Sequence, residues 1–266
     1  MERLSYSLKD VSEDYNGPVG LLWELIMGEQ IHVGGFKSSM ALAQKAGIQK
    51  GWKGLDLCSA LGAGCRFLVK NFGVTMCGLD GTVTMHRKAQ ERAEQEGLAD
   101  KIELRLGDVT EIPWPDNTFD FVWGEDAWCY VVDKEKLIQE GARVLKPGGV
   151  MAFTDWIEGP AGLSDEEAKR ICAFMKFRYM ENLEGYKKLI QQSGLTLVSV
   201  EDLTPAEFAS YVDLYIRMLT DQLTYDALKI IDDDMEMFQA MGAEMAFMGE
   251  KAREGKMGRG RFIARK

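Results

Sequence analysis

The chain has 266 residues, and its 42 acidic residues outnumber its 32 Lys and Arg residues, which gives a formal net charge of −10. This deficit of positive charge disfavours a nucleic-acid-binding protein, which needs a basic surface to displace counterions from phosphates, and it disfavours docking on an anionic membrane. With only two histidines, a metal site made of several histidines is also disfavoured, and we predict no metal.

The cysteines and the first residues of the chain indicate a compartment. Five cysteines without a CxxC pair lie among apolar neighbours, which is typical of buried free thiols under reducing conditions. The first residues lack the apolar core of a signal peptide, and no stretch approaches the roughly 20 apolar residues of a membrane helix. We therefore expect a cytoplasmic protein with one large domain, or one domain that carries an embedded cap.

Residues 1–50 predict a helical segment interrupted by glycines. From residue 54 onward, short apolar runs alternate with helices. Strands are expected at residues 54–58, 74–79, 102–106, 119–123 and 150–154. Helices are expected at 62–72, 83–96 and 134–145, and the last of these should end at the breaker Lys146-Pro147-Gly148-Gly149. This alternation predicts an α/β fold with a parallel sheet whose strands are buried on both faces by helices.

After Asp155 the pattern changes. Helices are expected at 164–177 and 185–193, a strand at 195–200, two longer helices next, and a last strand at 260–264. Apolar residues recur at three- and four-residue spacings in the second long helix: Leu228, Ile231, Met235, Phe238, Met241, Met245 and Met248. This Met-rich stripe is either an ordinary core face or a deformable wall beside a ligand.

The most informative segment is a predicted strand, turn and helix at residues 55–67, whose turn consists of very small residues. Small residues let a ligand lie against the backbone, and the following helix N-terminus offers free N–H groups. Acidic residues also close or follow consecutive strands: Asp56, Asp80, Asp108, Glu125 and Asp126. Because ligands of open α/β sheets bind at the carboxyl ends of the strands, we expect these acids to converge on one crevice, with Asp80 on a ribose.

The type of nucleoside cofactor follows from what the turn lacks. A dinucleotide would favour the full GxGxxG spacing, but Cys58 and Ala60 occupy its first two small positions, and no GxxxxGK[ST] P-loop occurs. Several acids and few basic groups favour a cofactor without phosphate and with a positive centre. S-adenosylmethionine (SAM) fits this description.

Five segments, in order and spacing, resemble the class I SAM-dependent methyltransferases over about residues 15–200. They are Leu55-Asp56-Leu57 with Gly62-Ala63-Gly64, Gly78-Leu79-Asp80, Gly107-Asp108-Val109, Phe119-Asp120-Phe121-Val122-Trp123 and Leu145-Lys146-Pro147-Gly148-Gly149. Further stretches are similar to the sarcosine/dimethylglycine and phosphoethanolamine N-methyltransferases. These are Gly28–Gly34, Arg66–Val69, Glu125-Asp126-Ala127, Ala142–Pro147 and Leu183–Tyr186.

The resemblance implies a Rossmann-like, doubly wound, mostly parallel seven-stranded sheet with helices on both faces. It implies a helical N-terminal lid at 1–50 and a SAM-binding domain at 51–266, with helical substrate-cap insertions at about 160–193 and 204–252. Its cofactor residues would be Asp56, Ala60 and Gly62 on the methionine side, Asp80 on the ribose, Asp108 and Val109 at the adenine, Glu125 facing the sulfonium, and Tyr15 and the His32 loop in the lid. The family usually has glycine at Cys58 and Ala60, so a less tight turn is expected.

Methyl transfer is an in-line displacement that needs alignment, exclusion of water and an unprotonated nucleophile. The candidates for this chemistry are Glu125, Asp126 and His32. Four aromatic residues form a candidate box for a methylated ammonium: Trp128, Tyr130, Trp156 and Tyr179. Arg178 is a candidate anchor for a carboxylate. Packing in the core and a solvated arginine are the alternatives.

The function predicted from the sequence is therefore a SAM-dependent methyltransferase acting on the nitrogen of a small amine or amino acid. Two alternatives remain open: a C- or O-methyltransferase of a quinone, phenol or lipid-like acceptor, and a non-catalytic SAM-binding protein. The expected partners are SAM, a small-molecule acceptor and, as an open alternative, a second copy of the chain in a homodimer. No nucleic acid and no membrane is expected.

Overall fold

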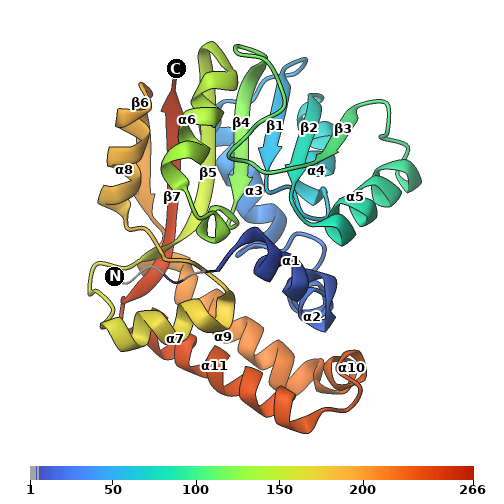
Figure 1. The fold of residues 1–266 in the computed structure, drawn as a ribbon, viewed down its shortest axis with the longest axis vertical. Helices are drawn as coiled ribbons and strands as arrows, with labels where there is room; N and C mark the ends of the chain where they lie inside the picture. The colour runs from blue at the N-terminus through green and yellow to red at the C-terminus, as the bar shows by residue number, and fades with distance from the viewer. Residues whose placement is uncertain (1–3, 5) are drawn as a thin grey trace.

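A computed structural model describes residue 4 and residues 6–266, apart from the side chains of residues 205 and 206. Its centre is a seven-stranded sheet with the order β3-β2-β1-β4-β5-β7-β6 (Figure 1). The strands are β1 (Lys53–Leu57), β2 (Thr75–Asp80), β3 (Ile102–Leu106), β4 (Phe119–Glu125), β5 (Leu145–Glu158), β6 (Thr196–Asp202) and β7 (Met257–Arg265). The pairs among β1 to β5 are parallel, and β7 runs antiparallel between β5 and β6. The predicted mostly parallel, doubly wound sheet is confirmed.

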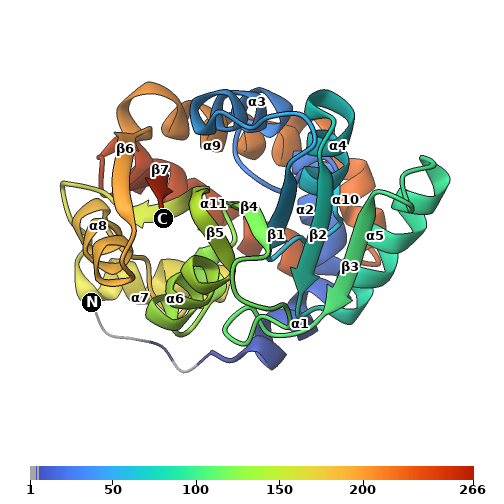
Figure 2. The ribbon, with the colours of Figure 1, turned by 90° about the horizontal axis from the view of Figure 1, so that it is seen from above.

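Helices cover both faces of this sheet (Figure 2). Helices α3 (Gly35–Ala46) and α4 (Ala63–Phe72) share one apolar core with it, and α6 (Lys134–Val144) and α8 (Leu183–Gln192) share another on the opposite face. Helix α5 (Val83–Gln95) packs against β2 and β3. The breaker at residues 146–149 ends α6, but it lies inside β5, opposite a register shift in β4.

A second group of helices lies beyond one end of the sheet (Figure 1). It consists of α1 (Leu8–Asn16), α2 (Pro18–Met27), α7 (Asp165–Met175), α9 (Ala209–Arg217), α10 (Thr224–Ile230) and α11 (Met235–Arg253). Short π-helical turns, Thr204–Phe208 and Met218–Gln222, flank α9. None of the described helices is long and apolar enough to cross a membrane.

The predicted Met-rich stripe lies on two helices instead of one. The chain turns between α10 and α11, where Asp232 and Asp233 adopt left-handed φ angles of 53° and 58°. Met241, Met245 and Met248 are buried in a core shared with α2 and α9, whereas Met235 is half exposed. The placement of a single continuous helix was therefore wrong, and the stripe is largely a core face of the helical layer. An Asp-rich segment tolerates a left-handed turn that apolar periodicity does not reveal.

The central strands leave no room for a side chain at Gly54. This residue pairs directly with Phe121 on β4, and a Cβ atom at position 54 would lie 2.1 Å from the Phe121 ring. Gly242 in α11 is a suitable control because nothing lies within 4 Å of its Cβ position.

We predict that Gly54→Ala lowers the free energy of unfolding by about 2–3 kcal/mol, because a buried ring must move. Gly242→Ala should raise it by about 0.5–1 kcal/mol, because alanine is favoured inside helices. Urea unfolding checks both values. Equal effects of the two substitutions would contradict the close packing at Gly54.

Candidate functional site

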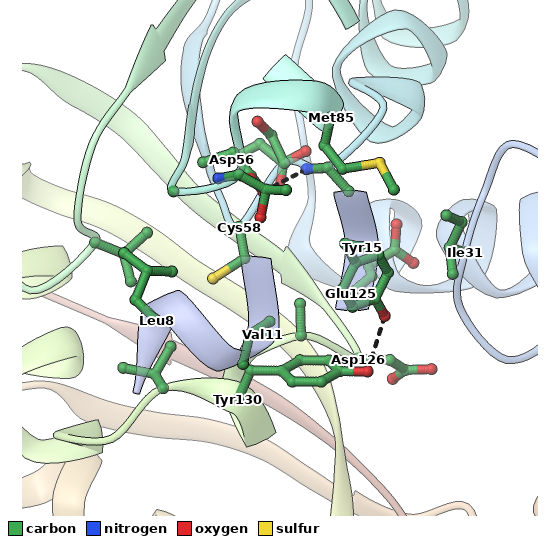
Figure 3. A pocket seen from close by; sticks show the side chains of 18 of the residues that line it. Leu8, Val11, Tyr15, Ile31, Asp56, Cys58, Met85, Glu125, Asp126 and Tyr130 are labelled. Atoms are coloured by element: carbon green, nitrogen blue, oxygen red, sulfur yellow. Dashed lines mark hydrogen bonds between the residues drawn. The ribbon is translucent and has the colours of Figure 1, made fainter. Parts of the chain in front are cut away.

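A cavity with a volume of about 460 Å³ lies at the carboxyl ends of β1, β2 and β4. Its walls come from the turn after β1, the ends of the neighbouring strands, helix α1 and the 28–34 loop. Figure 3 shows Asp56 and Glu125 from the sheet together with Leu8, Val11 and Tyr15 from α1 around this space. As the sequence predicts, the acids at the strand ends lie close together. The following acids line this one cavity: Asp56, Asp80, Asp108, Glu125 and Asp126.

The turn after β1 is tight although it contains two residues larger than glycine. Cys58 and Ala60 have φ angles of 63° and 42°, in the left-handed region that costs a non-glycine residue about 1–2 kcal/mol. A hydrogen bond of 2.8 Å from the Ala60 N–H to Asp80 Oδ2 holds the turn against β2. Gly62 also has a left-handed φ of 66°, but it precedes α4 and does not line the cavity.

Asp56 and Asp80 are buried beside each other under this turn. Burial, together with the negative charge of Asp80, raises the pKa of Asp56 to about 8, although the Cys65 thiol donates to Asp56 Oδ2 at 3.6 Å. Burial also raises the pKa of Asp80, opposed by N–H donors from Thr82 and Ala60. A Cβ at Gly64 would approach Asp56 Oδ2 to 2.9 Å, so this glycine keeps the carboxylate accessible. Neither acid has a hydrogen-bonded cation among the described residues.

Asp108 and Val109 line the part of the cavity beyond β3. Asp108 Oδ1 accepts hydrogen bonds of 2.8 Å from both the N–H and the hydroxyl group of Thr110. No hydrogen bond to Asp108 Oδ2 comes from the described residues, so this oxygen is open to a ligand next to Val109.

Glu125 is the acid at the centre of a polar cluster. It accepts hydrogen bonds from Ser39 Oγ at 3.0 Å and from Trp123 Nε1 at 3.1 Å, and His32 Nε2 lies 3.5 Å away. Burial raises the pKa of Glu125, opposed by the charges of His32 and Arg259 and by the Ser39 hydrogen bond.

Gln30 is a cavity residue that the sequence did not single out. Its Oε1 lies 3.2 Å from both His32 Nε2 and Ser39 Oγ, whereas its Nε2 is buried and has no partner in the described part of the chain. An amide with an unpaired buried donor is unfavourable unless a ligand supplies an acceptor. The Gly28–Gly34 stretch indicated this loop, but not which side chain faces inward.

Asp126 also borders the cavity, but both its carboxylate oxygens are engaged. Oδ1 accepts from Arg259 Nε at 2.7 Å, and Oδ2 accepts from the Val33 N–H at 2.8 Å. This arrangement differs from that of Glu125, whose donors are uncharged. The two neighbouring acids therefore have different surroundings.

Tyr15 and Tyr130 meet across the cavity, and their hydroxyl groups are 2.8 Å apart (Figure 3). Burial raises the pKa of both phenols, so both are protonated donors at neutral pH. Tyr15 comes from α1 and Tyr130 from the segment after β4. Their contact joins the N-terminal helix to the sheet.

The four-membered aromatic box expected from the sequence does not form. Trp128 is fully buried and stacks on Phe153 at 4.0 Å, and Tyr179 lies under the Lys134 ammonium group, 3.9 Å from its ring centroid. Trp156 reaches only a small cavity of about 20 Å³ behind Tyr15 and Tyr130. Of these four residues, Tyr130 alone lines the main cavity. The rings of Trp128 and Trp156 pack into apolar cores, and Tyr179 is buried beside Lys134.

Arg178 is the remaining predicted substrate residue, and it does line the main cavity. Its Nε is buried and has no hydrogen-bond partner among the residues that the structure describes. Among the lining residues that the structure describes, Arg178 is the one Lys or Arg side chain. A positive group at this position suits an anionic substituent of a ligand.

Comparison with known proteins agrees with this geometry. A family model described as "Methyltransferase domain" matches residues 55–153. A putative sarcosine dimethylglycine methyltransferase from Galdieria sulphuraria is 30% identical, with a TM-score of 0.78 over 87% of this chain and 84% of that one. Phosphoethanolamine N-methyltransferase from Triticum aestivum is 29% identical over 76% of this chain and 38% of its own length.

A further solved structure shows the shared fold. Haemonchus contortus phosphoethanolamine N-methyltransferase 2 in complex with S-adenosyl-L-methionine has a TM-score of 0.86, at 24% identity, over 98% of this chain and 60% of that one. The chain spans 33% to 62% of the length of the curated relatives it matches.

The raised pKa of Asp56 makes stability depend on pH. The folded-state pKa of about 8 lies above the ordinary value of 3.8. The contribution of the protonated Asp56 to the free energy of unfolding is therefore fully present below about pH 4 and is lost as the pH rises toward 8. We predict that Asp56→Asn stabilises the ligand-free protein relative to wild type as the pH rises from about 5 to about 8, by at most about 1.4 kcal/mol per pH unit.

Urea unfolding of both proteins across this range checks the prediction. Asp100→Asn removes an exposed carboxylate and is the control for net charge. A stability difference between Asp56→Asn and wild type that stays constant with pH would contradict the burial of a titrating carboxyl group at this position.

Proposed function

The chain belongs to the class I SAM-dependent methyltransferases, and on this premise we propose that it transfers a methyl group from SAM to the nitrogen of a small amine or amino acid. The observation that carries the proposal is the set of acids around one cavity: Asp56, Asp80, Asp108 and Glu125. These carboxylates have no hydrogen-bonded Lys or Arg among the described residues, and they suit a cofactor that is cationic and free of phosphate.

The donor set of the cavity fits SAM. Asp80 would hold the ribose hydroxyls, and Asp108 with Val109 would hold the adenine. Asp56 and Glu125 would face the methionyl amino group and the sulfonium. The unpaired amide of Gln30 offers the donor that the methionyl carboxylate needs. When bound, SAM supplies an electrophilic methyl carbon, and the protein supplies alignment and a dry site.

Helix α1 and the tyrosine pair would exclude water from the reacting atoms. Leu8 and Val11 present apolar surface to the cavity, and the Tyr15 hydroxyl bonds that of Tyr130. An amine that binds in its protonated form must lose that proton before its nitrogen lone pair can attack the methyl carbon. Glu125, with a pKa raised by burial and with His32 beside it, is the group we assign to accept this proton.

Arg178 supports an acceptor that carries a carboxylate or another anionic group. Such an amine would place its anionic end at Arg178 and its nitrogen toward the sulfonium. The apolar wall made by Leu8, Val11 and Met85 also suits a C- or O-methyl acceptor with a larger apolar body. The two classes differ in whether they need Arg178.

The test is incubation with isotope-labelled SAM and a panel of amines, amino acids, phenols and quinones, scored by mass spectrometry. Transfer to a carboxylate-bearing amine is the expected result. Arg178→Met should raise the KM for that acceptor about tenfold or more while the Kd for SAM is unchanged. Transfer confined to phenols or quinones would contradict N-methylation. Absence of SAM binding would contradict any SAM-dependent methyltransferase activity of this chain.

Asp80 gives a second prediction. We expect Asp80→Asn to raise the Kd for SAM about 10- to 100-fold, because hydrogen bonds to a charged group contribute about 1.5–3 kcal/mol. Titration calorimetry with SAM measures the change, and Asp100→Asn serves as the control. A small loss of thermal stability is also expected, since Asp80 accepts the N–H groups of Ala60 and Thr82. Unchanged affinity would place the cofactor elsewhere.

A further inference from the structure

A fully buried ion pair lies behind the cavity and joins parts of the chain that are distant in sequence. Arg259 Nε is 2.7 Å from Asp126 Oδ1, and the two side chains expose 2% and 1% of their surface. The other guanidinium nitrogens donate to Ser38 Oγ at 2.8 Å and to Thr154 Oγ1 at 2.9 Å. One side chain from β7 thus contacts α3, β5 and the residue that follows β4.

The backbone of β7 is shaped for this close approach. A Cβ at Gly258 would lie 1.7 Å from Thr204 Oγ1, and the Arg259 N–H donates to that same oxygen at 3.3 Å. Asp126 has a left-handed φ of 55°, a conformation that aspartate tolerates better than most residues. Both ends of the ion pair are therefore held by local backbone geometry.

The ion pair also holds the 28–34 loop. Asp126 Oδ2 accepts the Val33 N–H at 2.8 Å, and the next N–H, of Gly34, donates to the Tyr215 hydroxyl at 3.2 Å. This loop supplies Gln30 and His32 to the cavity wall. The adjoining helix α3 supplies Ser39, the donor to Glu125.

We propose that Arg259 is a positioning residue, which holds Asp126 and Ser38 and thereby fixes the 28–34 loop and Glu125 at the wall of the cofactor cavity. Asp126 then serves as the link to the loop, and Glu125 is the acid of the pair that meets the ligand. The identity of that ligand as SAM rests on the proposed function.

Charge supports the same role. The ionisable groups that act most strongly on Glu125 among the described residues are His32 from the loop, Asp126 after β4 and Arg259 from β7. Burial raises the pKa of Glu125, and the positive charge of Arg259 opposes that rise. Loss of this charge is expected to favour the protonated form of Glu125, which a cationic ligand binds less well.

The experiment compares Arg259→Met and Arg259→Lys with wild type, using SAM as the probe. Arg259→Met should raise the Kd for SAM at least tenfold, move the pH midpoint of SAM binding upward, and speed hydrogen exchange of the Val33 amide. Arg259→Lys keeps the positive charge but loses the simultaneous contacts with Asp126, Ser38 and Thr154. Its pH midpoint of SAM binding should therefore be close to that of wild type, while its Val33 amide should still exchange faster than in wild type. Arg261→Met is the matched control, because Arg261 is also buried in β7 but pairs with Glu201.

A second variant separates positioning from folding, because an unpaired buried charge destabilises a protein. Asp126→Asn combined with Arg259→Met removes both charges and should return Tm toward wild type, while the Kd for SAM stays at least tenfold raised. A wild-type Kd in this double variant, or a wild-type Kd and pH midpoint in Arg259→Met, would overturn the proposal. If wild type itself does not bind SAM, the proposed function fails, and the Val33 exchange rates still decide whether Arg259 holds the loop.

Discussion

Carboxylates buried at the ends of neighbouring strands are the constraint around which this protein is organised. Removing a carboxylate from water is unfavourable unless hydrogen bonds or a cation replace the lost hydration. Asp80 obtains backbone N–H groups from the turn and from the start of α5, and Glu125 obtains Ser39 and Trp123. Asp126 receives a buried arginine instead. Asp56, Asp80 and Glu125 have no hydrogen-bonded Lys or Arg among the described residues, so a positively charged ligand would stabilise their ionised forms.

Helix α2 and the 28–34 loop are held in place by two different kinds of contact. On one side, Arg66 of α4 bonds Glu29 in the 28–34 loop and the Leu61 carbonyl of the turn, while Glu24 of α2 meets Lys88 and Arg92 of α5. On the other side, α2 packs into the apolar core that contains the buried methionines of α11. Charged contacts position the loop next to the small-residue turn, and apolar packing positions the helical layer behind it.

The fold and the strand-end acids that line the cavity were largely predictable from the sequence, because their signals are local. Strand and helix boundaries follow from apolar periodicity and glycine placement, and acids that follow parallel strands must meet at one edge of the sheet. Asp80 and Asp108 were found in this way. The direction of a side chain within a tightly packed layer has no such signal, which is why Trp128 and Tyr179 were expected at a ligand but pack elsewhere.

By itself, the sequence determined the α/β class, the order of its elements and the ring of strand-end acids around one crevice. Only the tertiary structure decided the separate surroundings of Glu125 and Asp126, the free amide of Gln30 and the place of Arg178 on the cavity wall. The physical reason is the distance along the sequence over which each kind of interaction acts. Periodicity and turn chemistry act over a few residues, whereas Arg259 and Asp126 are 133 residues apart and meet only when β7 inserts between β5 and β6.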